Sequence, residues 1–400
     1  MPDTQNILLS QIEALGRELA RTGSLLNDVP LPFDAAVRDR AVGEFEKLLG
    51  REQSELAAIR ARVMEGDVTA ESWTALQRIA ARTTPLFAES LAFLEGALAR
   101  ENGLDDGLCR LVDSLLDELS TRTGVMWERF TILADGEFFA GTADIIRIRF
   151  PDTSVWSLPV AAHEFGHFAG PALTSSTSAG TVHPFEILVQ REAPAWKAPH
   201  VHELFADVFA TYTLGPAYAF TCVAGRFDPS RAYLDAIGHP APAKRVHAVL
   251  GTLARIAQEE DQAGGYQAPV GELAEAWTSL LAVGGQAEPP EYAGGSATIV
   301  DLDRLVDALY DLLKEQLRPR GMYGAERLLT AQQLAGAIGR SAQLGDRSLP
   351  ELPDGVLLAD IVNAAWLARW RNWELTPELG HIVVDLCDSL VGAPRARARR

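Results

Sequence analysis

Two histidines and a glutamate interrupt an otherwise apolar stretch, VAAHEFGHFAG, at residues 160–170. His163 and His167 are four residues apart, so a helix would place both imidazoles on one face, one turn from each other. One tetrahedral ion can bind both, and Glu164 could then act as general base toward a water at the ion. Two hydrogen-bonded core histidines would fit the spacing but would leave Glu164 unexplained. We therefore interpret the stretch as an H-E-x-x-H zinc motif with one ion.

A catalytic zinc ion usually has three protein ligands and one open position. The stretch HELFADVFATY at 202–212 supplies candidates, because Glu203 and Asp207 are one helical turn apart among apolar residues. Two carboxylates on a buried helix are costly unless an ion or a hydrogen-bond partner offsets their charge. We predict that Glu203 is the third ligand and that Asp207 accepts a hydrogen bond from a ligand histidine. His202 and His200 remain alternative ligands.

A third polar element is GHPAPAKRV at 238–246. His239 lies between a glycine and a proline, which indicates a turn, and Arg245 falls in the first turn of the next helix. Peptide cleavage at zinc needs a donor that faces the developing oxyanion, and His239 with Arg245 could provide it. A capping histidine and a solvated arginine fit the same spacing. Tyr212 is a rival donor, or else a core tyrosine.

Taken in order, HEFGH, ELFADVFA and HPAPAKR resemble the CAAX prenyl endopeptidase family of gluzincin metallopeptidases. The likeness covers residues 160–246, a little over a fifth of the chain. It implies that His163, His167 and Glu203 bind zinc. It also implies that Glu164 is the general base, that Asp207 is a supporting carboxylate, and that His239 with Arg245 lies near the scissile carbonyl. The best-known members are membrane proteins, whereas this sequence has no apolar stretch long enough to span a bilayer. A prenylated, membrane-embedded substrate is therefore not expected.

The composition narrows the classes of partner. The chain has 400 residues, 36 basic against 54 acidic, and a formal net charge of −18. Such a surface repels phosphate backbones and anionic lipids, so we expect a protein or peptide substrate, no nucleic acid and no membrane insertion. Three scattered cysteines without a CxxC motif and the absence of a signal-peptide pattern favour a cytoplasmic protein. The oligomeric state stays open.

Hydrophobic periodicity predicts mainly helices. We expect one helix to begin at Thr84-Pro85 and another to end at Gly124. Strand signals are confined to 130–150. A helix from about Trp156 carries the first motif, a mobile loop follows at 174–180, and Gly/Pro clusters at 264–296 indicate a boundary. Further helices are expected at about 200–213, 242–259 and from 299 onward.

The predicted fold is mostly α: an α+β zincin-like core with a small mixed sheet, flanked by helical regions. We expect a helical N-terminal region at 1–124 and the core at 125–262. A helical C-terminal region at 263–390 and a disordered basic tail at 391–400 follow. Trp366, Trp370 and Trp373 are expected to pack a helix, with a peptide-binding platform as the alternative.

The functional hypothesis is zinc-dependent hydrolysis of peptide bonds with Glu164 as general base. The substrate would lie extended along the strand at 145–150, with the loop at 174–180 as a lid. Two alternatives remain. One is a regulatory zincin of the repressor-cleaving type that cuts a single dedicated partner, and the other is a non-catalytic interaction protein that zinc stabilises.

Overall fold

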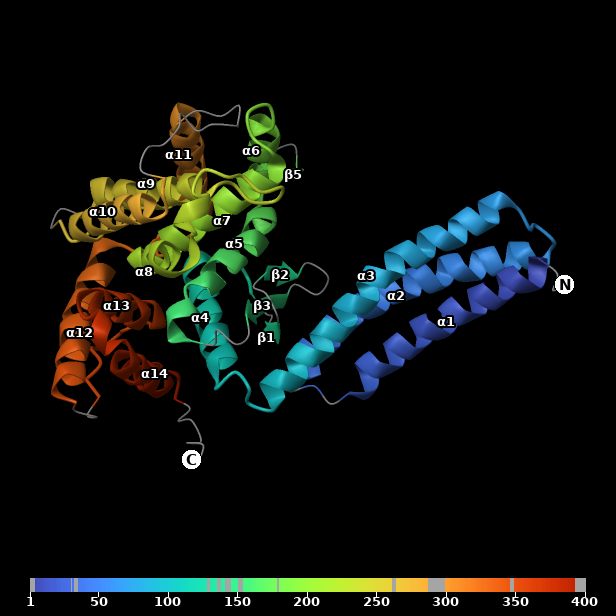
Figure 1. Ribbon diagram of the computed structural model, residues 1–400, viewed down its shortest axis with the longest axis horizontal. Helices are drawn as coiled ribbons and strands as arrows, with labels where there is room; N and C mark the ends of the chain where they lie inside the picture. The colour runs from blue at the N-terminus through green and yellow to red at the C-terminus, as the bar shows by residue number, and fades with distance from the viewer. Residues whose placement is uncertain are drawn as a thin grey trace. The chain divides into compact units, whose positions relative to one another are not determined.

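The chain folds mostly as helices, as the periodicity predicts. The computed structural model (Figure 1) describes residues 4–29, 31, 35–127, 130–134, 138–140, 145–149, 154–177, 180–260, 264–286, 299–345 and 349–392. It divides into two compact units, each of which uses two segments of the chain: Met1–Cys109 with Arg129–Pro151, and Arg110–Glu128 with Asp152–Arg400. These units divide the chain differently from the four ranges expected from the sequence. Most of the basic tail lies outside the described residues.

Three long helices dominate the first unit and pack side by side (Figure 1): α1 (Thr4–Asp28), α2 (Ala35–Met64) and α3 (Ala70–Glu101). In α1, Leu8, Ile12, Leu15 and Leu19 recur every three or four residues and all are buried. That spacing forms one apolar stripe along the helix, and the stripe drives the packing.

The expected helix start at Thr84-Pro85 is wrong. The helix α3 begins earlier, after Thr69, whose hydroxyl accepts a hydrogen bond from the Ser72 amide at 3.3 Å. Pro85 lies inside α3, where it removes a backbone donor. Thr83 and Leu86 on either side of it are buried, so tertiary packing holds the helix together across the proline.

The strands form a small mixed sheet in the first unit. Its elements are β1 (Thr131–Ala134), β2 (Phe138–Ala140) and β3 (Ile145–Arg149), in the order β1-β3-β2. The central strand β3 is parallel to β1 and antiparallel to β2, so both of its edges are already paired. The expectation that a substrate strand pairs with β3 is therefore wrong for its described residues.

The second unit is built from short and medium helices. They are α4 (Leu108–Thr123, whose first two residues belong to the first unit), α5 (Val160–Ala172), α6 (Pro184–Glu192), α7 (Ala198–Leu214), α8 (Pro216–Thr221), α9 (Pro242–Glu260), α10 (Gln267–Val283), α11 (Ile299–Gln316), α12 (Ala325–Leu344), α13 (Leu358–Arg371) and α14 (Thr376–Val391). As expected, Gly124 stops this helix: α4 ends at Thr123, and the φ of 82° at Gly124 suits glycine.

Two expectations about connecting segments need correction. The segment 174–180 carries β4 (Ser175–Thr177) and the start of β5 (Gly180–Val182), which pair antiparallel instead of forming an open loop. The Gly/Pro-rich range 264–296 contains α10, since its apolar positions Leu273 and Trp277 are buried. Residues 287–298 of that range lie outside the described part of the chain.

The tryptophans near the C-terminus pack helices, as expected. Trp366 of α13 is buried and stacks on Phe220, and Trp370 contacts the same phenylalanine with ring centroids 4.9 Å apart. Trp373 contacts Trp370. Cys109, Cys222 and Cys387 are buried free thiols. Among the helices that the structure describes, none is both long enough and apolar enough to cross a bilayer.

Candidate metal centre

Helix α5 presents the two histidines of the H-E-x-x-H motif. It begins at Val160, directly after Pro159, which is tolerated there because the first turn of a helix needs no amide donors. His163 and Glu164 are buried, and His167 is partly buried. The two imidazole centroids lie 4.7 Å apart, so consecutive turns of α5 place both rings on one face, as the spacing predicts.

A close crossing of α5 and α7 brings the third candidate ligand to this face. A Cβ atom on Gly166 would lie 2.8 Å from the Cα of Ala206, a distance that real side chains do not occupy. The lack of a side chain at Gly166 and the small one at Ala206 let the two backbones approach. Glu203, one turn before Ala206 on α7, then reaches the histidines.

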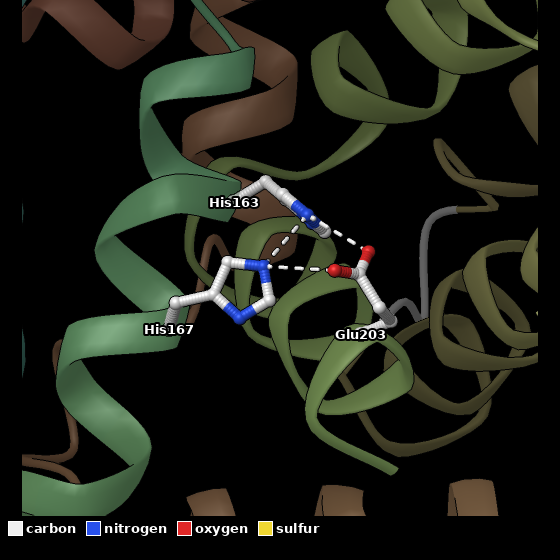
Figure 2. Close-up of side chains that lie close together, drawn as sticks. All are labelled: His163, His167 and Glu203. Carbon is white, nitrogen blue, oxygen red and sulfur yellow. Dashed lines mark hydrogen bonds and ion pairs between the residues drawn. The ribbon is translucent and has the colours of Figure 1, made fainter. Parts of the chain in front are cut away.

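His163, His167 and Glu203 form what we call the ligand group (Figure 2). The Nε2 atoms of the two histidines are 3.2 Å apart. Glu203 Oε1 lies 3.4 Å from His167 Nε2, and Oε2 lies 3.5 Å from His163 Nε2. Two ligands of a tetrahedral zinc ion, with bonds of about 2.0–2.2 Å, are roughly 3.3–3.6 Å apart. The two histidine nitrogens have this spacing, each carboxylate oxygen of Glu203 lies at it from one of them, and one donor atom of each residue lies within 4.8 Å of the others.

The chemistry of the ligand group also fits a cation. Glu203 Oε2 is buried and has no hydrogen-bond partner among the described residues. Leaving a buried carboxylate oxygen unsatisfied is costly, and a bound cation removes that cost. Two imidazole nitrogens and one carboxylate are ligands that a transition metal accepts. The ligand group could thus hold a metal ion.

Asp207 supports the group from the next turn of α7. Its side chain is fully buried, and Oδ1 lies 3.1 Å from His163 Nδ1. The hydroxyl of Tyr218, on α8, donates to the same oxygen at 2.5 Å and lies 3.0 Å from His163 Nδ1. A carboxylate at Nδ1 favours the tautomer that carries its hydrogen there and leaves Nε2 free for a metal.

Arg245, in the first turn of α9, pairs with Asp207 in two-pronged fashion. Its Nε donates to Oδ2 at 2.7 Å and its Nη2 donates to Oδ1 at 2.8 Å. Its Nη1 lies 3.5 Å from Glu203 Oε2. Two of its three nitrogens therefore donate to Asp207, so Arg245 holds in place the carboxylate that contacts His163. The predicted role of Arg245 at a scissile carbonyl remains a prediction.

The buried ionisable groups of the site shift one another's pKa values. Burial would raise the pKa of Asp207, but Arg245 and His163 hold it down at about 2. Burial would lower the pKa of His163, yet the nearby carboxylates of Asp207 and Glu203 raise it to about 9. The pKa of Glu203 is likewise below its ordinary value, since His163, His167 and Arg245 outweigh its burial. The site thus keeps two carboxylates ionised in a low-dielectric interior.

The remaining candidates fall into two classes. His239 is exposed, and its Nε2 lies 3.4 Å from Glu203 Oε1, so it lies beside the ligand group without joining it. His202 packs edge-on against a phenylalanine ring, and His200 Nε2 contacts the Ala236 carbonyl at 3.0 Å. Tyr212 is buried against the ring of Tyr310, which fits the core interpretation. None of His202, His200 and Tyr212 contributes to the ligand group.

Tyr218 is the residue of the site that the sequence reasoning missed. It lies in the apolar stretch GPAYAF, where nothing in the spacing relates it to the motifs. The available signal was weak: a tyrosine in a run that must be buried needs a hydrogen-bond partner for its hydroxyl. Which partner it finds depends on the turn between α7 and α8.

No family model, no curated protein and no solved structure matches this chain.

Proposed function

We propose that this chain is a zinc-dependent metallopeptidase with a zincin-like core, which hydrolyses peptide bonds of a protein or peptide. The observation that carries the proposal is the ligand group: one donor atom of each of its three residues lies within 4.8 Å of the others, and Glu203 contributes a buried oxygen that has no hydrogen-bond partner. Three protein ligands leave a coordination position open, which is typical of a catalytic zinc site. The adjoining glutamate Glu164 supplies the base that hydrolysis needs.

Each residue has a defined task in this proposal. When bound, zinc would supply Lewis-acid chemistry that polarises the scissile carbonyl and acidifies a water. Glu164 accepts the proton of the attacking water and returns it to the leaving amine. Asp207 and Tyr218 lie at His163 Nδ1, and Arg245 holds Asp207 in place, so that Nε2 would be free to bind the ion.

The exposed His239 is the side chain best placed to approach the substrate. It is 61% exposed and lies on a turn beside Glu203. We expect it to donate a hydrogen bond to the developing oxyanion, as the sequence predicts.

Glu164→Gln tests the proposal, because it removes the base and keeps the shape of the side chain. The full chain is reconstituted with one equivalent of zinc at neutral pH and incubated with a cell extract, and new peptide termini are identified by mass spectrometry. The unsubstituted protein should produce cleavage sites that are absent from the Glu164→Gln sample, while zinc content is equal in both. Identical termini in the two samples would refute the peptidase function.

The same samples distinguish the alternatives. A regulatory zincin would cut one protein of the extract and leave the others intact. A structural ion would give no cleavage, and the protein would unfold when zinc is chelated.

A further inference from the structure

The turn between α7 and α8 determines where Tyr218 lies. Tyr218 is three residues beyond Gly215, the residue that separates the two helices. Its hydroxyl donates to Asp207 Oδ1 and lies 3.0 Å from His163 Nδ1. Its ring is nearly parallel to the imidazole of His163, with the two centroids 5.9 Å apart. A change in this turn would therefore move a side chain that contacts the ligand group.

One side of the turn packs against the segment that leads into α12. Gly215 has a φ of 67° and a ψ of −147°, a conformation that strains any residue with a side chain. A Cβ atom at Gly215 would also lie 2.5 Å from the ring of Tyr323. The amide of Tyr323 donates to the carbonyl of Tyr212, in the last turn of α7, at 2.8 Å. The absence of a side chain at Gly215 thus lets the turn lie against Tyr323.

Asn363 of α13 bonds to the backbone on both ends of the turn. Its Nδ2 donates to the Leu214 carbonyl at 2.7 Å, and its Oδ1 accepts a hydrogen bond from the Ala217 amide at 2.9 Å. Nδ2 also donates to the Ala359 carbonyl, one turn earlier in α13, at 2.8 Å. The last carbonyls of a helix and the first amides of the next have no partner within their own helices. Asn363 therefore supplies partners that α7 and α8 lack.

Burial makes these hydrogen bonds of Asn363 hard to replace. Asn363, Leu214 and Ala217 each have no exposed surface, so bulk water does not reach them. A buried backbone group that loses its partner costs free energy, and the local backbone shifts if that provides another partner. Because Tyr218 directly follows Ala217, such a shift would displace the Tyr218 hydroxyl from Asp207 and His163.

We propose that Asn363 is a positioning residue of the metal centre: it fixes the α7–α8 turn so that Tyr218 meets Asp207 and His163. Groups that bond to the second nitrogen of a ligand histidine orient its ring and strengthen its bond to the metal. Helix α13 thus contributes to zinc affinity although Asn363 does not belong to the ligand group. The inference rests on the zinc site of the proposed function and does not depend on peptide cleavage.

Zinc affinity of the full chain, measured by chelator competition at neutral pH, tests the inference. Tyr218→Phe removes the hydroxyl at His163 and should weaken zinc binding about tenfold. Asn363→Ala removes the bonds to the turn and should weaken it about threefold to tenfold. The double variant should bind zinc no more weakly than Tyr218→Phe alone, because Asn363 acts through Tyr218.

Leu386→Ala separates positioning from general loosening of the C-terminal helices. Leu386 is buried in α14, which packs against α12 and α13, so its loss leaves a cavity away from the turn. This variant should keep the zinc affinity of the unsubstituted protein within about twofold. The visible spectrum of the Co²⁺-loaded protein reports ligand geometry, and it should change in Asn363→Ala and Tyr218→Phe but not in Leu386→Ala.

A second substitution makes the test independent of whether Asn363→Ala folds. Asn363→Asp keeps the shape of the side chain and an acceptor for the Ala217 amide, but a carboxylate cannot donate to the Leu214 carbonyl. It should also weaken zinc binding threefold or more and should change the Co²⁺ spectrum.

Denaturant unfolding of the metal-free proteins keeps this inference distinguishable from the proposed function. The loss of stability in the double variant should be smaller than the sum of the losses in Asn363→Ala and Tyr218→Phe, because both belong to one network. Non-additive losses in a chain that binds no zinc would support the positioning of Tyr218 and refute the proposed function. Full zinc affinity in a folded Asn363 variant, or additive losses in either measurement, would overturn the inference and leave the peptidase function intact.

Discussion

Helix α1 and the pair α5/α7 bury different kinds of side chain. The buried residues of α1 are leucines and one isoleucine, so that helix contributes to stability through apolar burial alone. The buried face of α7 includes Glu203 and Asp207, and that of α5 includes His163 and Glu164. Each of these groups costs free energy unless a partner offsets its desolvation. The buried face of α1 therefore contributes packing alone, whereas α5 and α7 bury ionisable groups that need partners, as a ligand site does.

Two arginine–carboxylate ion pairs, one in each unit, allow the difference in burial to be measured. In the first unit, Arg82 donates to both oxygens of Glu52, and the side chain of Arg82 is 37% exposed. In the second, Arg245 donates to both oxygens of Asp207, and Asp207 has no exposed surface. Arg82 also pairs with Glu55 and so keeps an acidic partner when Glu52 is lost, whereas Arg245 donates two hydrogen bonds to Asp207, so the same change should have unequal effects.

The largest effect is expected from Asp207→Ala. It leaves Arg245 and His163 buried without their carboxylate, which should cost about 3–5 kcal/mol of unfolding free energy. Glu52→Ala is the matched control and should cost clearly less, since Arg82 regains water. Denaturant unfolding of the metal-free proteins measures both. Equal losses would remove the distinction between the two regions.

The stability that Asp207 contributes should be lost at low pH. The pKa of Asp207 is depressed from 3.8 to about 2, so its stabilisation is complete above its ordinary pKa. It is lost as pH falls through about 2. The stability difference between the unsubstituted protein and Asp207→Ala should therefore shrink in that window.

Next in size is the loss of metal. Glu203→Ala removes a predicted ligand and should weaken zinc binding by more than about 100-fold, since even residues that only support a ligand cost 10–100-fold. His202→Ala, on the same helix, should retain one equivalent of zinc because His202 packs against Phe185. Elemental analysis after dialysis and a chelator competition distinguish the two. Zinc lost from His202→Ala and kept by Glu203→Ala would reassign the third ligand.

Replacing a glycine by alanine should have opposite effects on stability in the two units. Gly166→Ala forces α5 and α7 apart at Ala206 and should destabilise the protein by about 1–3 kcal/mol and weaken zinc binding. Gly43→Ala, inside α2, meets no atom within 4 Å and should stabilise it by about 0.5–1 kcal/mol through better helix propensity. Thermal unfolding with and without zinc tests the pair, and a stabilised Gly166→Ala would contradict the close crossing.

Zinc affinity should also depend on pH. The pKa of His163 is raised to about 9, so below that pH zinc must displace a proton from it. The apparent affinity should therefore rise about tenfold per pH unit up to that value and then level off. The first unit contains no histidine, so the linkage is specific to the second. Calorimetry in buffers of different ionisation enthalpy counts the proton released, and an affinity that is flat above pH 7 would contradict the shift.

Local sequence patterns predicted helices correctly where the helix depends on residues close in sequence. The stripe of α1 and the helix stop at Gly124 are examples, because both depend on neighbours in sequence. The start of α3 was mispredicted, since burial on both sides of Pro85 overrides the local signal. The pairing of β3 on both edges was also missed, because strand order depends on contacts between distant segments.

For the site, the sequence by itself determined that His163 and His167 share a face, because a four-residue spacing on a helix leaves no other arrangement. It also supplied Glu203 and Asp207 as candidates one turn apart. Only the tertiary structure decided that Glu203 and not His202 reaches the histidines, and that Asp207 is held by Arg245 and Tyr218. The physical reason is that helix geometry fixes angles within a few turns, whereas the contacts of α5, α7, α8 and α9 depend on tertiary packing, of which the close approach of α5 to α7 at Gly166 is one part.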